Sequence, residues 1–386
     1  MSKKYDIVLL GATGFTGKLI ADYLVRHRGK ENTAIALAGR NPKALEALVA
    51  SLPEQAVAIE LCDITLEDSL DALASKTLII MNAAGPFTYW GKNVVASCIK
   101  NKTHYLDITG EPSFVADVYK TYHQDAVNAG VCIINCCGFD SIPADLTTWM
   151  TARQLPHDKP MILDGFVRTN AQFSGGTLNT AIEMLHQESG KKNVKLKIPR
   201  HVDTPKVKLS LHFNKDMQAW AIPMPVVDPH IVKRSIYHLP LDYGYATAYR
   251  QFFVRSTFWK TMKTILPVGL AFMLVRFPAF RNFMKKKFPP GTGPSDITRE
   301  KSVFEFTCVG TSDGKKVVTK MKGGDPGYNE TAKMFSEAAF ALLDKIKNNA
   351  LKTGVLTPAH ALGDNLATRL QNEGIKIEQI VTELGK

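Results

Sequence analysis

Three glycines at three-residue steps most constrain what the first part of this chain can fold into. The stretch YDIVLLGATGFTGKLIADYL, from Tyr5 to Leu24, places Gly11, Gly14 and Gly17 between a run of branched apolar residues and a segment of helical spacing. In a strand–turn–helix, the first glycine permits the tight turn, the second lets a pyrophosphate approach the backbone, and the third lets the helix pack close to the strand. The alternative to a pyrophosphate-binding turn is a loop that needs glycine only for its backbone conformation.

A regular alternation of strands and helices follows this turn. Short runs that are apolar throughout are typical of parallel strands covered on both faces, and right-handed crossovers between them give a doubly wound fold. The sequence therefore predicts an α/β protein that begins with a Rossmann domain. The expected strands are 7–10, 33–38, 56–61, 77–82, 104–108 and 131–136, and the expected helices are 15–27, 42–52, 66–74, 91–100 and 113–129.

In that context the glycine-rich turn predicts a dinucleotide cofactor. The N–H groups at the start of a helix, together with the helix dipole, favour a bound anion. The residues expected at the cofactor diphosphate are Gly11, Ala12, Thr13, Gly14, Phe15, Thr16 and Gly17.

The end of the second expected strand discriminates between NAD and NADP. Sheets that bind NAD usually carry Asp or Glu there, to hold the ribose 2′-hydroxyl. This chain has Arg40 followed by Asn41, and a guanidinium can hold a 2′-phosphate through two hydrogen bonds. The sequence therefore predicts NADP(H), with a solvated surface arginine as the alternative.

Two more loops lie at carboxyl ends of expected strands. Asp63 is expected to accept a hydrogen bond from the adenine amino group, or else to cap the next helix. The loop after the fourth strand is expected at the edge of the nicotinamide ribose, and it consists of Asn82, Ala83, Ala84, Gly85 and Pro86.

Length and composition limit the remaining classes. A chain of 386 residues exceeds what one core usually holds, so two domains are expected. The six cysteines form no C-x-x-C pair and the ten histidines form no H-E-x-x-H motif, so we expect reduced thiols, a cytoplasmic location and no metal site. The first apolar run is too short for a signal peptide.

The second half departs from the alternation. Segments 162–170 and 207–213 are expected strands, and 303–321 is expected to form a hairpin around Asp-Gly. The motif SGGTLNT at 174–180 is a second glycine-rich helix start, which either holds a carbonyl, carboxylate or phosphopantetheine group or is a plain turn with Thr177 as the cap.

Residues 251–290 carry much of the net charge of +12. This window has eight basic residues and no acidic one, and 252–288 contains nine aromatic residues. Its longest uncharged run, 264–275, is too short to span a bilayer. Aromatic residues mixed with cations favour contact with an anionic membrane surface. A buried helix pair and a homodimer interface are the alternatives, and no recognition motif supports nucleic-acid binding.

Several motifs in order resemble the saccharopine dehydrogenase-like oxidoreductases, a family that includes trans-acting enoyl reductases and lipid-droplet-associated homologues. The resemblance implies an NADP-binding Rossmann domain at 1–150, an inserted α+β domain for substrate or dimerisation at 151–325, and C-terminal helices at 326–386 that return to the first domain. It also implies lipid-linked substrates. The motifs are GATGFTG, LAGRN, NAAGPFTYWG, YLDITGE, GFDSIPAD, SGGTLNT, DPHIVKRS, GGDPGYNETAKM and GVLTPA.

The resemblance makes reduction of a lipid or acyl-type (enoyl) substrate the expected function. The basic aromatic residues of 251–290 make a peripheral position on the inner face of a membrane the expected location. Tyr89 and Asp140, together with Ser141, follow expected strands, and Tyr328 lies in the returning segment, so these are candidate proton donors or structural residues. A saccharopine-type amino-acid dehydrogenase and a non-catalytic NADP-binding protein on lipid surfaces are the alternatives.

Overall fold

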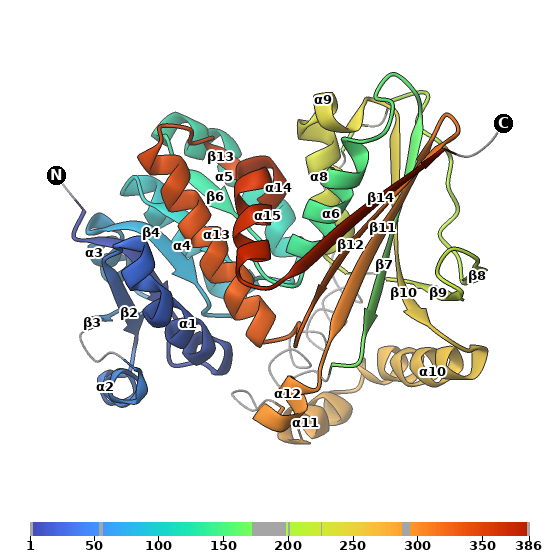
Figure 1. Cartoon of the computed structure of the whole chain (residues 1–386). Coiled ribbons are helices and arrows are strands. Elements are labelled where there is room, and N and C mark those ends of the chain that lie inside the picture. Colours follow the sequence, from blue (N-terminus) through green and yellow to red (C-terminus); the bar gives the residue numbers. More distant parts are fainter. Residues whose placement is uncertain are drawn as a thin grey trace. The chain divides into compact units, whose positions relative to one another are not determined.

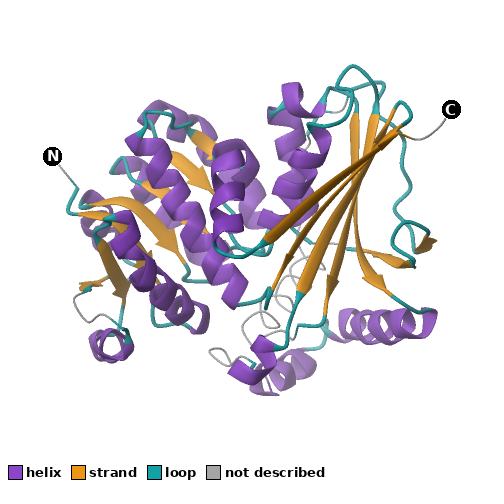
Figure 2. Ribbon diagram, viewed as in Figure 1, coloured by secondary structure: helices purple, strands orange, loops and turns teal. Residues whose placement is uncertain are grey.

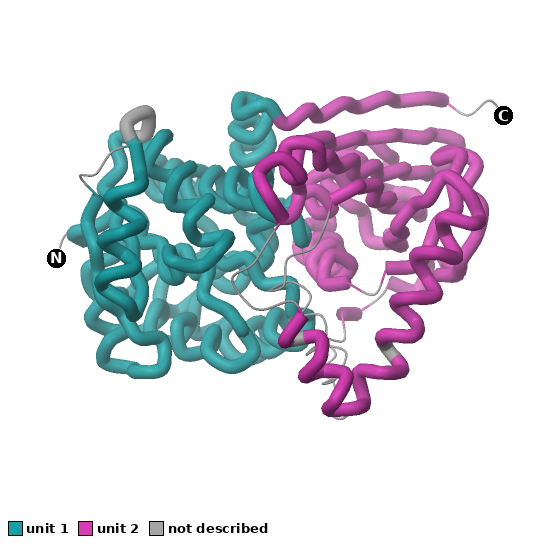
Figure 3. The backbone as a smooth tube through the Cα atoms, turned by 90° about the horizontal axis from the view of Figure 1, so that it is seen from below, with its two compact units in different colours: residues 1–142, 194–196, 328–374 teal, residues 143–193, 197–327, 375–386 magenta. Residues whose placement is uncertain are grey.

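The computed structural model describes residues 3–53, 57–171, 198–199, 201–224, 226–287 and 294–383. The motif at 174–180 lies outside these residues. The chain divides into two compact units (Figure 3). The first comprises the described residues of 1–142 and 328–374, and the second those of 143–327 and 375–386.

The first unit is built on a seven-stranded sheet in which every neighbouring pair is parallel. Its order is β13-β6-β5-β4-β1-β2-β3, and helices lie on both of its sides (Figures 1 and 2). Its elements are β1 Tyr5–Leu10, α1 Phe15–Glu31, β2 Ile35–Gly39, α2 Pro42–Ser51, β3 Ala58–Leu61, α3 Glu67–Ser75, β4 Thr77–Asn82, α4 Phe87–Lys100, β5 His104–Asp107, α5 Pro112–Ala129, β6 Cys132–Ile134, α13 Asn329–Lys347, β13 Gly354–Leu356, α14 Pro358–Ala361 and α15 Gly363–Asn372.

The doubly wound prediction is confirmed, and the reason lies in the uniformly apolar strands. Val8 and Leu10 pack with Ile80, Val94 and Phe114 in one buried cluster under the helices of one face. After β3 the chain returns to the centre of the sheet and β4 pairs with the other side of β1. The carboxyl ends of β1 and β4 therefore form the switch point, where doubly wound sheets bind ligands.

The returning helices of the first unit are fastened by a buried ionic cluster. Glu337 of α13 is almost fully buried and accepts hydrogen bonds from the Tyr23 hydroxyl of α1, at 2.9 Å, and from Arg369 Nε of α15, at 2.7 Å. Arg369 also donates to Asp344, at 3.0 Å. Desolvation raises the pKa of Glu337, and the charge of Arg369 opposes that shift. The cluster therefore joins three helices that are far apart in the sequence.

The second unit is a mixed seven-stranded sheet with helices. Its order is β14-β12-β11-β7-β10-β9-β8, in which only the β7–β10 pair is parallel. Its elements are α6 Ile142–Ala152, β7 Met161–Thr169, β8 His212–Asn214, β9 Ala219–Pro223, α8 Asp228–His238, α9 Pro240–Tyr243, β10 Thr247–Arg255, α10 Phe258–Leu274, α11 Pro278–Lys287, α12 Asp296–Glu300, β11 Phe304–Ser312, β12 Lys315–Gly323 and β14 Lys376–Glu383.

The predicted hairpin is confirmed in this unit, with Asp313 and Gly314 at positive φ in its turn. The predicted strand 207–213 is wrong for most of its length, because only 212–214 finds a partner, in β9. Among the described residues, no helix combines the length and the apolar character that spanning a bilayer requires.

The ends of the units differ from the expected domain limits. Helix α6 belongs with the second sheet, and its Thr151 hydroxyl donates to Thr319 Oγ1 of β12 at 2.7 Å. C-terminal helices are present in the first unit, but the last segment is not helical. Residues 376–383 form a strand that pairs with β12 along its whole length, a long-range partner that local spacing does not reveal.

Candidate cofactor-binding site

The turn after β1 is closed by backbone contacts that only glycine permits. Gly11 has a φ of +86°, and a Cβ on it would lie 2.8 Å from the Ala84 nitrogen. A Cβ on Gly17 would lie only 2.2 Å from the Gly11 carbonyl oxygen. By contrast, a Cβ on Gly14 would meet only that same oxygen, at 3.4 Å. Gly11 and Gly17 therefore allow the backbone segments to pack closely, while Gly14 leaves the surface of the turn free of a side chain.

Helix α1 starts directly after Gly14, so its first turn lies beside the surface that Gly14 leaves without a side chain. Helix α1 begins at Phe15 and has no acidic residue in its first turn. The Lys18 N–H donates to the Gly14 carbonyl at 2.9 Å, and in general the first N–H groups of an α-helix have no intrahelical partner. Ala12 is fully buried and its N–H donates to Ala38 of β2. A diphosphate held by Thr13, Phe15, Thr16 and the glycines fits this arrangement.

Arg40 lies where a ribose phosphate would be recognised. It is exposed after the end of β2. Hydrogen bonds from Thr65 hold the pKa of Asp63 below its usual range, and the nearby charge of Arg40 lowers it further. These hydrogen bonds come from the N–H and hydroxyl of Thr65. The Asn41 side chain caps α2, since it accepts the Ala44 N–H at 3.1 Å, and its contact with the cofactor stays a prediction.

The loop from Asn82 to Pro86 is held against the glycine turn. The Ala83 N–H donates to the Leu10 carbonyl of β1 at 2.8 Å. Asn82 is fully buried, accepts the Ala84 N–H at 3.0 Å and donates to the Tyr105 hydroxyl at 3.1 Å. The backbone of Ala83 and Ala84 thus lines the turn at Gly11, and Gly85 and Pro86 continue it to α4.

A buried carboxylate that the sequence did not single out organises the next two strand ends. Asp107, at the end of β5, accepts hydrogen bonds from the N–H groups of Cys136 and Thr109 and from the Asn135 amide, at 2.7–3.1 Å. Desolvation raises the pKa of Asp107 to about 6, and these hydrogen bonds oppose that shift. The sequence signal for Asp107 was an acidic residue at the end of a strand, in YLDITGE. The sequence did not indicate its role because its partners Asn135 and Cys136 lie in the loop after another strand.

The loop after β6 has an unusual backbone. Cys136 and Ser141 are buried non-glycine residues with φ of +61° and +132°, and such conformations persist where the surroundings enforce them. Asp140 lies between them and is exposed as a residue, and a Cβ on Gly110 would lie 3.0 Å from its Oδ2. Desolvation nevertheless raises the pKa of Asp140.

The two tyrosine candidates lie in different environments. Tyr89, in the first turn of α4, is 53% exposed. Tyr328 precedes α13 and is buried, with its ring edge-to-face on Phe15 at 5.0 Å. In the same segment, Thr331 accepts the Phe139 N–H at 3.1 Å. The returning segment therefore touches both the glycine turn and the loop after β6.

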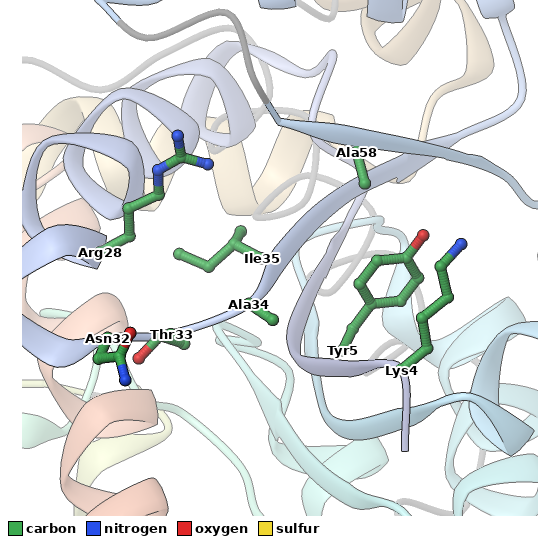
Figure 4. Close-up of a pocket in the computed structure, with 8 residues that line it drawn as sticks. All are labelled: Lys4, Tyr5, Arg28, Asn32, Thr33, Ala34, Ile35 and Ala58. Carbon is green, nitrogen blue, oxygen red and sulfur yellow. The ribbon is translucent and has the colours of Figure 1, made fainter. Parts of the chain in front are cut away.

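One hollow of the first unit lies at the edge of the sheet opposite the glycine turn. It encloses about 430 Å³ between the starts of β1, β2 and β3 and the end of α1 (Figure 4). Tyr5 and Ile35 begin strands there, with Arg28 above them. This hollow is remote from the glycine turn and is not the cofactor site. The described residues contain no cluster of His, Cys, Asp and Glu that could hold a metal ion.

Comparison with known proteins agrees with this geometry. The family model for the saccharopine dehydrogenase NADP-binding domain matches residues 7–134. A Mycobacterium tuberculosis protein provisionally named a trans-acting enoyl reductase is 32% identical, over 97% of this chain and 97% of its own. The chain belongs to the saccharopine dehydrogenase family.

Further relatives extend over the same length. A trans-acting enoyl reductase of Mycobacterium bovis is 30% identical over 97% of both chains. An Arabidopsis thaliana protein, provisionally named a mitochondrial saccharopine dehydrogenase-like oxidoreductase, is 27% identical over 97% of this chain and 96% of its own. The structure of apo saccharopine dehydrogenase (L-Glu forming) from Saccharomyces cerevisiae matches with a TM-score of 0.60 and 13% identity, over 98% of this chain and 100% of that chain, which establishes a shared fold.

Membership of the saccharopine dehydrogenase family confirms the predicted oxidoreductase class and the NADP cofactor. The contacts of individual residues with NADP remain predictions. The features that fit the cofactor are the clear surface at Gly14, the start of α1 without an acidic residue in its first turn, and the cation at Arg40.

Two alanine substitutions separate cofactor binding from folding. We expect Gly17→Ala to lower the melting temperature strongly, because its Cβ has no room beside the Gly11 carbonyl. Gly14→Ala should fold with nearly unchanged stability but bind NADPH at least about tenfold more weakly, because the methyl group intrudes where the diphosphate approaches. Calorimetric unfolding and NADPH titration measure the two effects, and equal NADPH affinity in Gly14→Ala and the unsubstituted protein would contradict the placement.

Arg40 should set the preference for NADPH over NADH. Arg40→Ala is expected to weaken NADPH binding by about tenfold to a hundredfold, the usual loss for hydrogen bonds to a charged group, while NADH affinity stays the same. The control is Arg26→Ala, which removes an exposed arginine of α1 paired with Asp22. Tighter binding of NADH than NADPH by the unsubstituted protein would refute the role of Arg40.

Proposed function

We propose that this protein uses NADPH to reduce the double bond of an enoyl group on a lipid or acyl chain, and that it works on a membrane surface. The observation that carries the reaction is the likeness, over 97% of both chains, to proteins named trans-acting enoyl reductases. When bound, the cofactor supplies a hydride. The protein must then orient the substrate, stabilise charge on its carbonyl oxygen and deliver a proton to the α-carbon.

Asp140 is our candidate for the proton donor. Desolvation raises its pKa and so favours its protonated form, and the residue follows β6 at the carboxyl edge of the sheet, where this fold carries its chemistry. Tyr89, which is 53% exposed, is the candidate donor to the carbonyl oxygen. The burial of Tyr328 against Phe15 favours a packing role for that residue.

The membrane proposal rests on the pair α10 and α11, which we call the basic helix pair. Trp259, Leu266, Leu270 and Met273 are spaced along one face of α10 and are all exposed, Trp259 at 75% and Met273 at 67%. Phe277, between the two helices, and Phe283 of α11 are exposed as well. The exposure favours a docking surface over the buried-helix alternative.

Charge points to the kind of surface that would cover these side chains. Lys260, Lys263, Arg276, Lys286 and Lys287 are exposed on or between the two helices, and residues 251–290 contain no acidic residue. Rings that enter the headgroup region beside cations that meet anionic lipids are the pattern of an interfacial helix. A bilayer with anionic lipids is therefore the proposed partner.

Two other functions compete with enoyl reduction. One is a saccharopine-type amino-acid dehydrogenase, but the match to the yeast enzyme, at 13% identity, extends to the fold and not to the substrate. The other is a non-catalytic NADP-binding protein on lipid surfaces. Measuring which substrates are turned over distinguishes the enoyl reductase, the amino-acid dehydrogenase and the non-catalytic protein.

The test is NADPH oxidation with trans-2-enoyl thioesters of increasing chain length, presented with anionic vesicles. We expect saturable consumption that rises with chain length. Asp140→Asn should reduce kcat by about a hundredfold or more while NADPH binding is retained. Consumption of NADPH only with amino-acid and oxo-acid pairs would favour the dehydrogenase, and binding without any turnover would favour the non-catalytic protein.

Membrane docking is tested by flotation with phosphatidylserine vesicles. The unsubstituted protein should float at low salt and less at high salt, because ions screen its cations. The double variant Trp259→Ser, Leu270→Ser should bind at least about tenfold more weakly, since it removes two apolar groups from the interface.

The matched control for flotation is Leu241→Ser, which removes an apolar side chain of α9 that is 82% exposed. Equal flotation of the double variant and this control, or no flotation at low salt, would defeat the membrane proposal. A change of the double variant from dimer to monomer, measured by sedimentation, would instead favour the homodimer interface.

A further inference from the structure

We infer that Glu111 is a positioning residue for cofactor binding: its buried carboxylate binds the first turn of α4 and thereby fixes the loop from Asn82 to Pro86 against Gly11. Glu111 Oε1 accepts the Phe87 N–H at 3.1 Å, and Oε2 accepts the Thr88 N–H at 2.7 Å. The Thr88 hydroxyl also donates to Oε2. Three donors at the start of one helix thus converge on one carboxylate.

These contacts suit a carboxylate better than any neutral group. The first N–H groups of a helix have no intrahelical partner, and the helix dipole favours negative charge beside them. Glu111 is 4% exposed, so little water competes for its hydrogen bonds. No side chain of α4 itself caps this helix end, so Glu111 supplies the cap from the neighbouring strand–helix unit.

Glu111 is held in place by its own segment. Its N–H donates to Thr109 Oγ1 at 3.1 Å, and the Thr109 N–H donates to Asp107 Oδ1 at 3.1 Å. Asp107 in turn binds the loop after β6. The short segment 107–111 therefore presents two buried carboxylates, and each organises a different loop at the carboxyl edge of the sheet.

The connection to the cofactor runs through a loop that is pinned at both ends. At its start, Asn82 is tied to Tyr105, and just after its end Glu111 holds Phe87 and Thr88. Between these points lie Ala83 and Ala84, whose backbone would be 2.8–3.0 Å from a Cβ on Gly11. Loss of the hydrogen bonds to Glu111 would let the loop shift at Ala83 and Ala84, where it lies closest to Gly11. The surface that the cofactor is expected to contact would then change.

Glu111 also limits where an anion from outside the chain, such as the cofactor diphosphate, can bind at this edge of the sheet. Two helices, α1 and α4, begin at the carboxyl edge near the switch point. The start of α4 already binds a carboxylate of this chain, so an external anion cannot take that place while Glu111 occupies it. Removal of Glu111 would leave a carboxylate-sized space at α4.

The experiment is NADPH titration of Glu111→Ala with and without added acetate. We expect the NADPH Kd to rise by about tenfold, the loss that follows from removing charge-assisted hydrogen bonds. Acetate should restore much of the affinity because it can occupy the vacated space. Neither acetamide, which has the shape without the charge, nor sodium chloride at the same ionic strength should do so.

The matched control is Asp71→Ala. Asp71 binds the opposite end of the same helix, accepting hydrogen bonds from Ser97 at 2.6 Å and Asn101 at 3.0 Å. Its loss should lower the melting temperature without changing the NADPH Kd, and acetate should have no effect. This control distinguishes positioning of the cofactor loop from general loss of α4 stability.

Glu111→Gln decides the case if Glu111→Ala does not fold, because it keeps the packing and one acceptor oxygen. We expect intermediate NADPH affinity that acetate does not improve. Wild-type NADPH affinity in a folded Glu111 variant, or equal weakening in Asp71→Ala, would overturn the inference. The test needs only cofactor binding, so failure of the enoyl proposal would leave it intact.

Discussion

The contact between the Gly17 backbone and the Gly11 carbonyl is the constraint on which the site depends. A Cβ at position 17 would lie 2.2 Å from that oxygen and 2.9 Å from the Ala12 carbonyl carbon. On its other side Gly11 meets the backbone of Ala84. Three backbone segments thus meet with no side chain between them. This closeness brings the start of α1, the end of β1 and the loop after β4 to one surface, which a dinucleotide can cover.

Buried polar side chains keep those backbone segments in register. Asn82 and Asp107 end β4 and β5, Glu111 lies just beyond β5, and Tyr105 within β5 accepts a hydrogen bond from Asn82. Asp107 and Glu111 each bind a neighbouring loop or helix start. Burying polar groups is unfavourable unless their hydrogen bonds are made. Once satisfied, such a network rigidifies its surroundings. The carboxyl edge is therefore stiffened by hydrogen bonds, where the rest of the sheet relies on apolar packing.

The sequence predicted the parts of the fold that depend on local pattern. Apolar strands, helical spacing and the three glycines lie within short windows, so the doubly wound sheet and the cofactor turn were recognisable. Glu111 was not, because its partners Phe87 and Thr88 are 23 residues or more away and belong to another helix. Strand β14 was missed for the same reason, since β12 lies more than 50 residues earlier. Acidic residues after a strand and a short alternating tail carry no sign of their partners.

Composition alone does not predict whether the basic helix pair is buried or exposed, but its charge helps to identify the partner of its exposed surface. Phe, Trp and Leu at helical spacing look the same in a core helix as in an exposed one, so only the burial of each residue separates the two. Exposure alone does not choose between a membrane and a second copy of the chain. An isologous dimer would bring the same surface of both copies together. Since the described exposed charges of this pair are all cationic, two copies would repel, and juxtaposed like charges disfavour such a partner. An anionic lipid surface meets the same cations with attraction, so charge favours the bilayer as the partner of these helices.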